Sequence, residues 1–356
     1  MTGPSFEPRH GAGPAAFDRT RKAHNPDISQ GPLRVSVIIP AHNAAPFIAE
    51  TLRSVLGQSY PADEVIVVDD GSDDGTCDVI RKGFPSEPRV RVLTSTVASG
   101  GPSAPRNRGV RVAEGDLIVL LDADDLLARD ALHWLVQFFG AAPSAGAAFF
   151  NIDLLDETAN SNMGPFLAEH ESFWRLHRRQ VAPWSYLIED PGAYRQLIET
   201  NFVRTAGTGI PRHVFDEVGF FDEGLVNSED LDLWLRILKR YPLGFIDRPG
   251  AYYRVRAGSV SADAWASRDR IRALHKHLAT ETDPRTKRTI SRKLAINHAH
   301  LGYELRTRGE FDQAERHYRT SLRYRPTWFA LKGLILTRAR WTKRQDPASR
   351  RSGSRS

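Results

Sequence analysis

Three clusters of acidic side chains have the types and spacing that could do chemistry in this sequence. Asp69-Asp70 precedes Gly71-Ser72, Asp122-Ala123-Asp124 places two carboxylates one residue apart, and Glu229-Asp230 follows Ser228. A nucleotide sugar carries a diphosphate whose charge must be compensated before it can leave, and Mg²⁺ or Mn²⁺ prefers carboxylate and phosphate oxygens. Asp122 and Asp124 fit such a site, with one carboxylate on the metal and the other on ribose hydroxyls or a metal-bound water.

Each cluster also has a purely structural interpretation. Acids are common at strand ends and turns, so the Asp122–Asp124 spacing alone is a weak signal. Asp69-Asp70 could belong to a turn that caps the next helix, or could hydrogen-bond the base or ribose of a nucleotide. Ser228 is a good N-cap, and acids in a first turn suit the helix dipole. A carboxylate of Glu229-Asp230 could instead take a proton from an acceptor hydroxyl.

The elements that must position these acids alternate between strand and helix. Apolar β-branched runs predict strands at residues 35–40, 64–68, 90–93 and 117–121, and helical spacing predicts helices at 45–59, 76–82 and 104–113. This order predicts an α/β fold with a mostly parallel sheet and helices on both faces. Ligands bind beyond the carboxyl ends of such strands, so residues 40–43, 69–72 and 122–124 should converge at one edge.

The second half of the chain is less regular up to residue 200 and then becomes helical. Helices are predicted around 213–218, at 229–240 and over 264–336, where residues 301–326 match the spacing of one tetratricopeptide repeat. Trp174, Trp184 and Tyr186 could stack on a sugar ring, although core packing is the favoured interpretation.

Charge and composition narrow the classes of function. The net charge of +6 lies entirely in residues 338–356, which hold seven basic residues and one acid. The neutral remainder argues against a nucleic-acid-binding face. No apolar run approaches the roughly 20 residues that span a bilayer, and the first residues lack the apolar core of a signal peptide, so a cytoplasmic location is expected. The single cysteine, Cys77, excludes an intrachain disulfide and is interpreted as a packing residue.

The basic segment has two interpretations. It is either a solvated, disordered tail or a surface that rests on an anionic membrane together with apolar residues just before or within it, Trp328, Phe329, Leu331, Leu334, Ile335 and Trp341. The sequence therefore leaves peripheral membrane contact open.

In order and spacing, the motifs together resemble glycosyltransferase family 2 over about residues 34–260. The matching segments are Ser36–Asn43, Val67–Ser72, Ala104–Gly109, Leu121–Asp125, Val218–Glu223 and Glu229–Trp234. The resemblance implies a GT-A type, Rossmann-like fold and an inverting reaction. The Q-x-x-R-W motif and membrane helices of the family's processive polymerases are missing, so transfer of a single sugar is expected.

The resemblance also implies roles for individual residues. Asp124 would be the metal ligand for Mg²⁺ or Mn²⁺, Asp122 would lie beside it on the metal or nucleotide, and Asp230 would be the general base with Glu229 in support. The donor, most commonly a UDP-sugar in this family, would contact Pro40, Ala41, Asn43, Asp69, Asp70, Arg106 and Asp122. The alternative is a non-catalytic interaction protein with a degenerate transferase domain, against which the intact Asp122, Asp124 and Asp230 argue.

These observations predict four segments. Residues 1–33 would be a disordered tail, and 34–262 a transferase domain with a nucleotide-binding half at 34–130 and an acceptor half at 131–262. A helical, tetratricopeptide-like extension would occupy 263–337, and a basic disordered tail 338–356.

Overall fold

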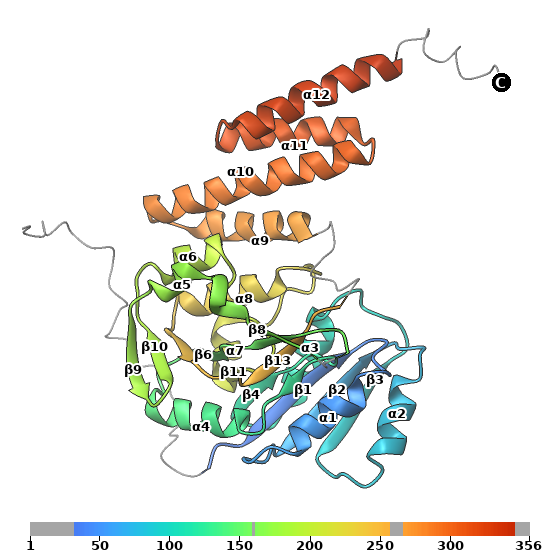
Figure 1. Ribbon diagram of the computed structural model, residues 1–356, viewed down its shortest axis with the longest axis vertical. Coiled ribbons are helices and arrows are strands. Elements are labelled where there is room, and N and C mark those ends of the chain that lie inside the picture. The colour runs from blue at the N-terminus through green and yellow to red at the C-terminus, as the bar shows by residue number, and fades with distance from the viewer. Residues whose placement is uncertain (1–31, 159–160, 257–265, 346–356) are drawn as a thin grey trace, which may run out of the picture.

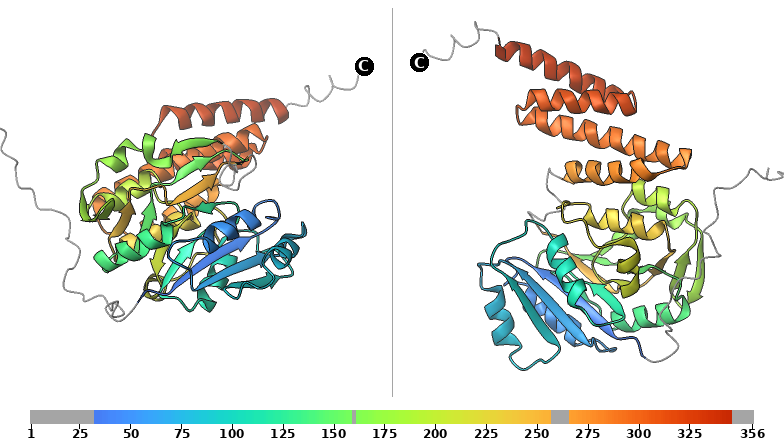
Figure 2. Two further views of the ribbon diagram at one scale, coloured as in Figure 1. Left: turned by 60° about the horizontal axis from the view of Figure 1, so that its bottom comes forward. Right: turned by 180° about the vertical axis from the view of Figure 1, so that it is seen from behind.

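The computed structural model describes residues 32–158, 161–256 and 266–345 as an α/β body followed by a stack of helices (Figure 1). The chain begins at the sheet with β1 and ends in α12 at the far end of the helical stack, as the view from behind also shows (Figure 2). The helical extension therefore projects from the side of the body that carries α6 and α8.

A nine-stranded sheet forms the centre of the body, in the order β3-β2-β1-β4-β11-β6-β12-β10-β9. Strands β1 to β4 are mutually parallel, and β6 and β12 also pair in parallel. The antiparallel β11 joins these two groups, while β10 and β9 add an antiparallel edge. The bounds are β1 Val35–Ala41, β2 Glu64–Asp70, β3 Val90–Ser95, β4 Leu117–Leu120, β6 Ala147–Phe150, β9 Arg178–Ala182, β10 Ser185–Ile188, β11 Thr208–Pro211 and β12 Leu243–Ile246.

Helices cover both faces of this sheet because successive strand residues point to opposite sides. Val37 and Ile39 of β1 pack in the core beneath α1 (Ile48–Leu56), α2 (Thr76–Gly83) and α4 (Ala131–Ala141). Ile38, between them, belongs to the core beneath α3 (Ser103–Val112) and α8 (Glu229–Leu238). The predicted mostly parallel sheet with helices on both faces is thus confirmed.

The stretch up to residue 200 that was predicted to be irregular supplies two strands of a second, four-stranded sheet, the edge strands β9 and β10 of the large sheet, and short helices. The small sheet has the order β5-β13-β7-β8. Its strands are short, which explains why no periodicity marked them. The bounds are β5 Leu126–Leu127, β7 Asp153–Leu155, β8 Asn162–Pro165, β13 Ala251–Arg254, η2 Phe166–Glu169, α5 Glu171–Trp174, α6 Ala193–Glu199 and α7 Arg212–Val218.

The predicted helical extension is present as four helices, α9 Ala266–Thr280, α10 Pro284–Thr307, α11 Phe311–Tyr324 and α12 Trp328–Gln345. Helix α9 packs on α8, and α10 packs on α6, so the extension is joined to the body by side-chain contacts. Helix α12 runs to Gln345, so residue 338, the predicted start of the disordered basic tail, lies too early in the sequence. The other part of that tail, 346–356, and most of the predicted N-terminal tail, 1–31, lie outside the described residues.

None of the helices in the described part of the chain combines the length and apolar character needed to cross a bilayer.

Candidate active site

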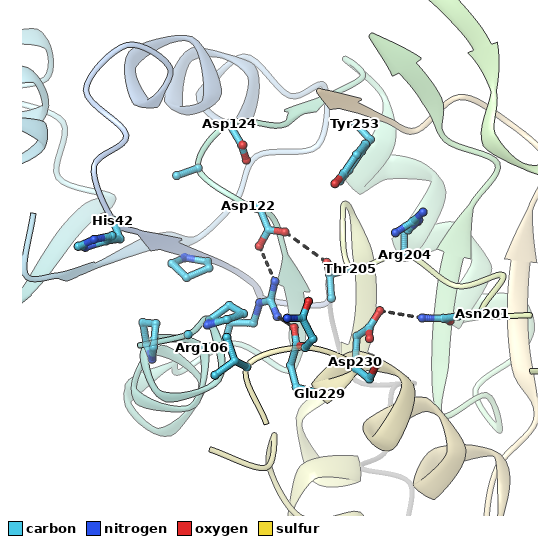
Figure 3. A pocket seen from close by; sticks show the side chains of 18 of the residues that line it. His42, Arg106, Asp122, Asp124, Asn201, Arg204, Thr205, Glu229, Asp230 and Tyr253 are labelled. Atoms are coloured by element: carbon cyan, nitrogen blue, oxygen red, sulfur yellow. Dashed lines mark hydrogen bonds and ion pairs between the residues drawn. The ribbon is translucent and has the colours of Figure 1, made fainter. Parts of the chain in front are cut away.

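A cavity of about 890 Å³ opens at the carboxyl ends of β1, β2 and β4 (Figure 3). Its opposite wall comes from the segment before β11, the start of α8 and two helices of the extension. The lining includes Pro40, Ala41, Asn43, Asp70, Arg106, Asp122, Asp124, Glu229 and Asp230. Nine of the ten residues predicted for the site therefore meet in one place, and Asp69 is the exception.

The loops after β1 and β2 are tied together on the predicted nucleotide side. The Asn43 backbone N–H donates to Ser72 Oγ at 2.9 Å, and Asn43 Oδ1 accepts from the Asp73 N–H at 3.0 Å. Asn43 has a φ of 50°, a left-handed conformation that asparagine tolerates better than most residues. Asp70 Oδ2 accepts from both the backbone and the hydroxyl of Ser99, which fixes this carboxylate at the cavity wall.

Asp69 does not line the cavity, so its predicted contact with the donor has no support from its position. Its side chain is buried and accepts from the Ser72 N–H at 2.8 Å and from Cys77 Sγ at 2.6 Å. Burial and the neighbouring Asp69 carboxylate raise the pKa of Cys77 to about 11, so the thiol stays protonated and donates this bond. Asp69 and Cys77 thus hold the turn that presents Asp70.

The turn Asp122–Asp125 at the end of β4 is held from two sides. Thr51 on α1 donates its hydroxyl to the carbonyl of Ala123 at 2.8 Å. Arg254 on β13 donates from its backbone to Asp125 Oδ1 at 2.9 Å and from Nε to the Asp124 carbonyl at 2.9 Å. These bonds fix the backbone of the acidic turn, so the carboxylates of Asp122 and Asp124 are presented to the cavity from a rigid support.

Arg106 connects two of the acidic clusters. Its Nη2 lies 2.6 Å from Asp122 Oδ1 and its Nη1 lies 2.7 Å from Glu229 Oε1, with the guanidinium 3% exposed. Burial alone would lower the pKa of Arg106, but the charges of Asp122 and Glu229 outweigh it and raise the pKa. Asp122 also accepts from the Thr205 hydroxyl at 3.4 Å (Figure 3).

Glu229 and Asp230 at the start of α8 face the cavity. Ser228 has a φ of 62° and makes no side-chain capping bond, so the N-cap interpretation is wrong for Ser228, although Glu229 and Asp230 do lie in the first turn of the helix. Burial and the charge of Asp230, opposed by Arg106, raise the pKa of Glu229 to about 7. Asp230 Oδ2 accepts from Asn201 Nδ2 at 2.9 Å (Figure 3).

The residues present fit a hard divalent cation. Asp122 and Asp124 offer oxygen ligands in one cavity, and burial together with the Asp122 charge raises the pKa of Asp124. A cation would relieve that repulsion, a role the Arg256 guanidinium fills at 2.5 Å from Asp124 Oδ2. No group of three or more His, Cys, Asp or Glu side chains within the described ranges could hold a metal ion, so ligands beyond these would have to come from a donor and water.

Several cavity residues were missed by the sequence analysis. They are mainly aromatic and basic side chains from short loops and from the extension: Phe47, Phe166, His170, Asn201, Arg204, Thr205, Tyr253, Arg256, Ser267, Arg270 and Asn297. No local pattern marks them, because each reaches the cavity through tertiary packing alone.

The aromatic residues that were singled out lie elsewhere. Trp184 is 52% exposed at the turn between β9 and β10, so the favoured core interpretation is wrong for it. Tyr186 stacks on Phe245, as expected of a packing residue, while Trp174 packs edge-on against Phe245 and is 36% exposed. None of the three lines the cavity.

Similar proteins agree with this fold and motif set. The chain is 37% identical over 102 residues to a poly(ribitol-phosphate) beta-glucosyltransferase of Bacillus spizizenii, a match covering 28% of this chain and 16% of that protein. The S. aureus TarS structure, residues 1–349 in complex with UDP-GlcNAc, superposes with a TM-score of 0.59 at 18% identity, covering 88% of this chain and 93% of that one. A Pyrobaculum calidifontis mannosyltransferase in complex with GDP-Man and Mn²⁺ gives 0.55 at 20% identity, covering 92% and 85%.

The extent of these matches differs. The chain spans 16%, 26% and 41% of the length of three of the curated relatives that it matches. The two structures share the fold at low identity. The family profile of glycosyl transferase family 2 matches residues 36–218, more than half of the chain. The segment that carries the acidic turn, Arg106 and most of the central sheet thus follows the family pattern, and the chain belongs to glycosyl transferase family 2.

Proposed function

We propose that the protein transfers one sugar from a nucleotide-diphosphate sugar, most simply a UDP-sugar, to an acceptor hydroxyl with inversion, in the synthesis of a surface polysaccharide or glycoconjugate. The observation that carries this proposal is the convergence of Asp122, Asp124 and Asp230 on one cavity at the strand ends. Nothing in the cavity or among the similar proteins favours the alternative of a non-catalytic interaction protein.

The residues suggest a division of the cavity. The nucleotide would lie against Pro40, Ala41, Asn43 and Asp70, at the end of the cavity where Figure 3 places His42. Asp230 lies toward the other end, near Asn201. The donor's anomeric carbon would sit between them.

The proposed step is an in-line displacement. The acceptor oxygen forms a bond to the anomeric carbon while the bond from that carbon to the diphosphate oxygen breaks, which inverts the configuration. The acceptor proton passes to the Asp230 carboxylate, and the nucleoside diphosphate leaves with the bonding electrons. The hydrogen bond from Asn201 would orient Asp230. The ion pairs of Arg106 with Asp122 and Glu229 would hold the acidic turn and the start of α8 in a fixed position relative to each other.

Mg²⁺ or Mn²⁺ would be held by Asp124 with Asp122 beside it, and when bound would neutralise the charge of the leaving diphosphate. Arg256, whose side chain is half-buried, would have to release Asp124 for this. The carboxylate-only character of the turn favours these hard cations over zinc.

A panel of UDP-, GDP- and dTDP-sugars tests the proposal through release of the nucleoside diphosphate in the presence of Mn²⁺. One donor should turn over in the wild type. Asp230→Asn should lower the rate about 10²- to 10⁴-fold and keep nucleotide binding, because only the proton acceptor is removed. Full activity in Asp230→Asn, or loss of nucleotide binding in that variant, would refute the assigned role.

We further propose peripheral membrane contact through α12 and the basic segment that follows it. Trp328, Phe329 and Ile335 are 71%, 50% and 55% exposed on this helix. Lys332 lies between them in the sequence, and Arg338, which pairs with Glu315, follows them. Exposed aromatic and aliphatic side chains beside basic ones suit an anionic lipid surface.

Co-sedimentation with phosphatidylglycerol and phosphatidylcholine vesicles separates the outcomes. The full chain should bind the anionic vesicles, and Trp328→Ser with Ile335→Ser should weaken that binding. Equal, negligible binding to both kinds of vesicle would eliminate the proposal.

A further inference from the structure

Two arginines that line the cavity form no ion pair with a carboxylate of the described residues. Arg204 and Arg270 both line the cavity, and neither forms an ion pair with any residue of the described ranges. Every other arginine close to the acidic turn is paired: Arg106 with Asp122 and Glu229, Arg254 with Glu50, and Arg256 with Asp124. An uncompensated charge in a partly buried site is costly, so such a pair indicates a missing counter-ion.

Packing holds Arg204 in place. Its guanidinium lies 4.3 Å from the ring centre of Phe166 and 5.4 Å from that of Tyr253. Its Nε is buried and without a hydrogen-bond partner in the described structure. The two rings orient the guanidinium while its Nε makes no hydrogen bond within the described residues, an arrangement that suits a preorganised anion site.

Arg270 comes from α9 of the helical extension. Burial lowers the pKa of Arg270, the charge of Asp230 opposes this effect, and the charge of Arg204 adds to it. The two guanidinium groups therefore repel each other electrostatically, and both lie near Asp230, the predicted general base. Glu199, the other acid in this part of the lining, is already neutralised by Arg292 and Lys293 on α10.

The position of the pair separates it from the donor's phosphates. Figure 3 places Arg204 beside Asn201 and Asp230, across the cavity from His42 and the loops assigned to the nucleotide. A group bound there belongs to the molecule whose hydroxyl Asp230 would deprotonate. Arg270, Ser267 and Asn297 all come from α9 and α10, so the extension completes this wall.

We propose that Arg204 and Arg270 form an acceptor subsite for a negatively charged group, a phosphodiester or a carboxylate, that neighbours the hydroxyl receiving the sugar. Guanidinium groups bind both anions through paired N–H donors. The proposal rests on the proposed transferase function and makes the helical extension part of the substrate site.

The test measures binding of short oligomers of equal length by the full chain with UDP and Mn²⁺ present. The oligomers are glycerol phosphate, galacturonate and neutral glucose chains, which separate phosphodiester, carboxylate and uncharged acceptors. The wild type should bind one anionic oligomer more tightly than the neutral one. Arg270→Gln should weaken that binding about tenfold, Arg270→Lys should weaken it less, and UDP binding should not change. Arg288→Gln, on the exposed side of α10, is the matched control and should bind like the wild type.

The subsite would be overturned by equal affinity for all three oligomers, by no binding of any oligomer, or by an Arg270→Gln variant that binds them like the wild type. Loss of UDP binding in Arg270→Gln would also overturn it, by assigning the arginine to the donor. Absence of binding of UDP, GDP and dTDP alike by the wild type would instead refute the transferase function itself.

Discussion

Arg106 Nη2 lies 2.6 Å from Asp122 Oδ1, which joins the helix after β3 to the acidic turn after β4. The same guanidinium reaches Glu229 on α8, so one buried charge connects three segments that are far apart in the sequence. Asn107, the next residue, exchanges hydrogen bonds with the backbone of Phe221 and so ties the same helix to the loop before α8. Residues of separate family motifs are therefore linked directly by ion pairs and hydrogen bonds.

Removing this charge should destabilise the fold. Arg106→Met should lower the free energy of unfolding by about 3–5 kcal/mol, because Asp122 and Glu229 are left without their buried partner. Urea unfolding followed by circular dichroism measures the change. Arg81→Met is the control, since Arg81 pairs with Asp78 in solvent and should cost under about 1 kcal/mol. Equal losses of unfolding free energy in the two variants would contradict the claim that the buried ion pairs stabilise the fold more than an exposed one.

The close approach of α3 to the sheet gives a second prediction. A Cβ built on Gly109 would lie 2.5 Å from Ile38 Cγ2 and 3.3 Å from Val68 Cγ2, while one on Gly83 meets nothing within 4 Å. Gly109→Ala should therefore cost about 1–3 kcal/mol and displace Arg106, whereas Gly83→Ala should be neutral or slightly stabilising. Thermal unfolding of both variants tests this contrast, and a neutral Gly109→Ala would contradict the packing of α3.

The ion pairs that connect α8 of the body to α9 of the extension should weaken in acid. Asp232 on α8 is fully buried and pairs with Lys276 at 2.9 Å, His277 at 3.2 Å and Arg236 at 2.9 Å. Burial would raise the pKa of Asp232, but the bond from His277 and the charges of Arg236 and Lys276 lower it below its ordinary value of 3.8.

A carboxyl group whose pKa is lower in the folded state stabilises the fold at neutral pH and loses that contribution as pH falls below about 4. Asp232→Asn should cost about 2 kcal/mol at pH 7 and progressively less as the pH falls below about 4. Denaturant unfolding across this range checks the dependence. Asp312→Asn, an exposed acid on α11, is the control. A cost for Asp232→Asn that does not vary with pH would contradict the ion-pair explanation.

The sheet and the gathering of most residues proposed for the donor were predictable because their signals are local. The apolar runs at 35–40, 64–68 and 117–121 each became a buried strand of the predicted type, and the parallel order follows from their alternation with helices. The polar residues after those strands meet at one edge for the same topological reason.

Adjacent residues with similar chemistry were harder to separate. Asp69 and Asp70 both end β2, yet successive strand residues alternate in direction, so Asp70 reaches the cavity while Asp69 is buried behind it. Nothing in the two residue types indicates which one faces a ligand.

The wall that we propose for the acceptor could not be predicted, because it is assembled from distant segments. Arg204 precedes β11, Tyr253 lies on β13 and Arg270 lies on α9, and no spacing rule relates them. Their roles depend on how the extension docks, which is decided by tertiary contacts such as those of Asp232 with Lys276 and His277.

Calorimetric titration with UDP, GDP and dTDP, with and without Mn²⁺, tests the central claim most directly. The wild type should bind one nucleotide in a Mn²⁺-dependent manner. Asp124→Ala should lose the metal dependence and most of the affinity, whereas Asp312→Ala, on the exposed start of α11, should bind like the wild type. Failure of the folded wild type to bind any of the three nucleotides, or unchanged Mn²⁺-dependent binding by Asp124→Ala, would contradict the assignment of the acidic turn as the donor and metal site.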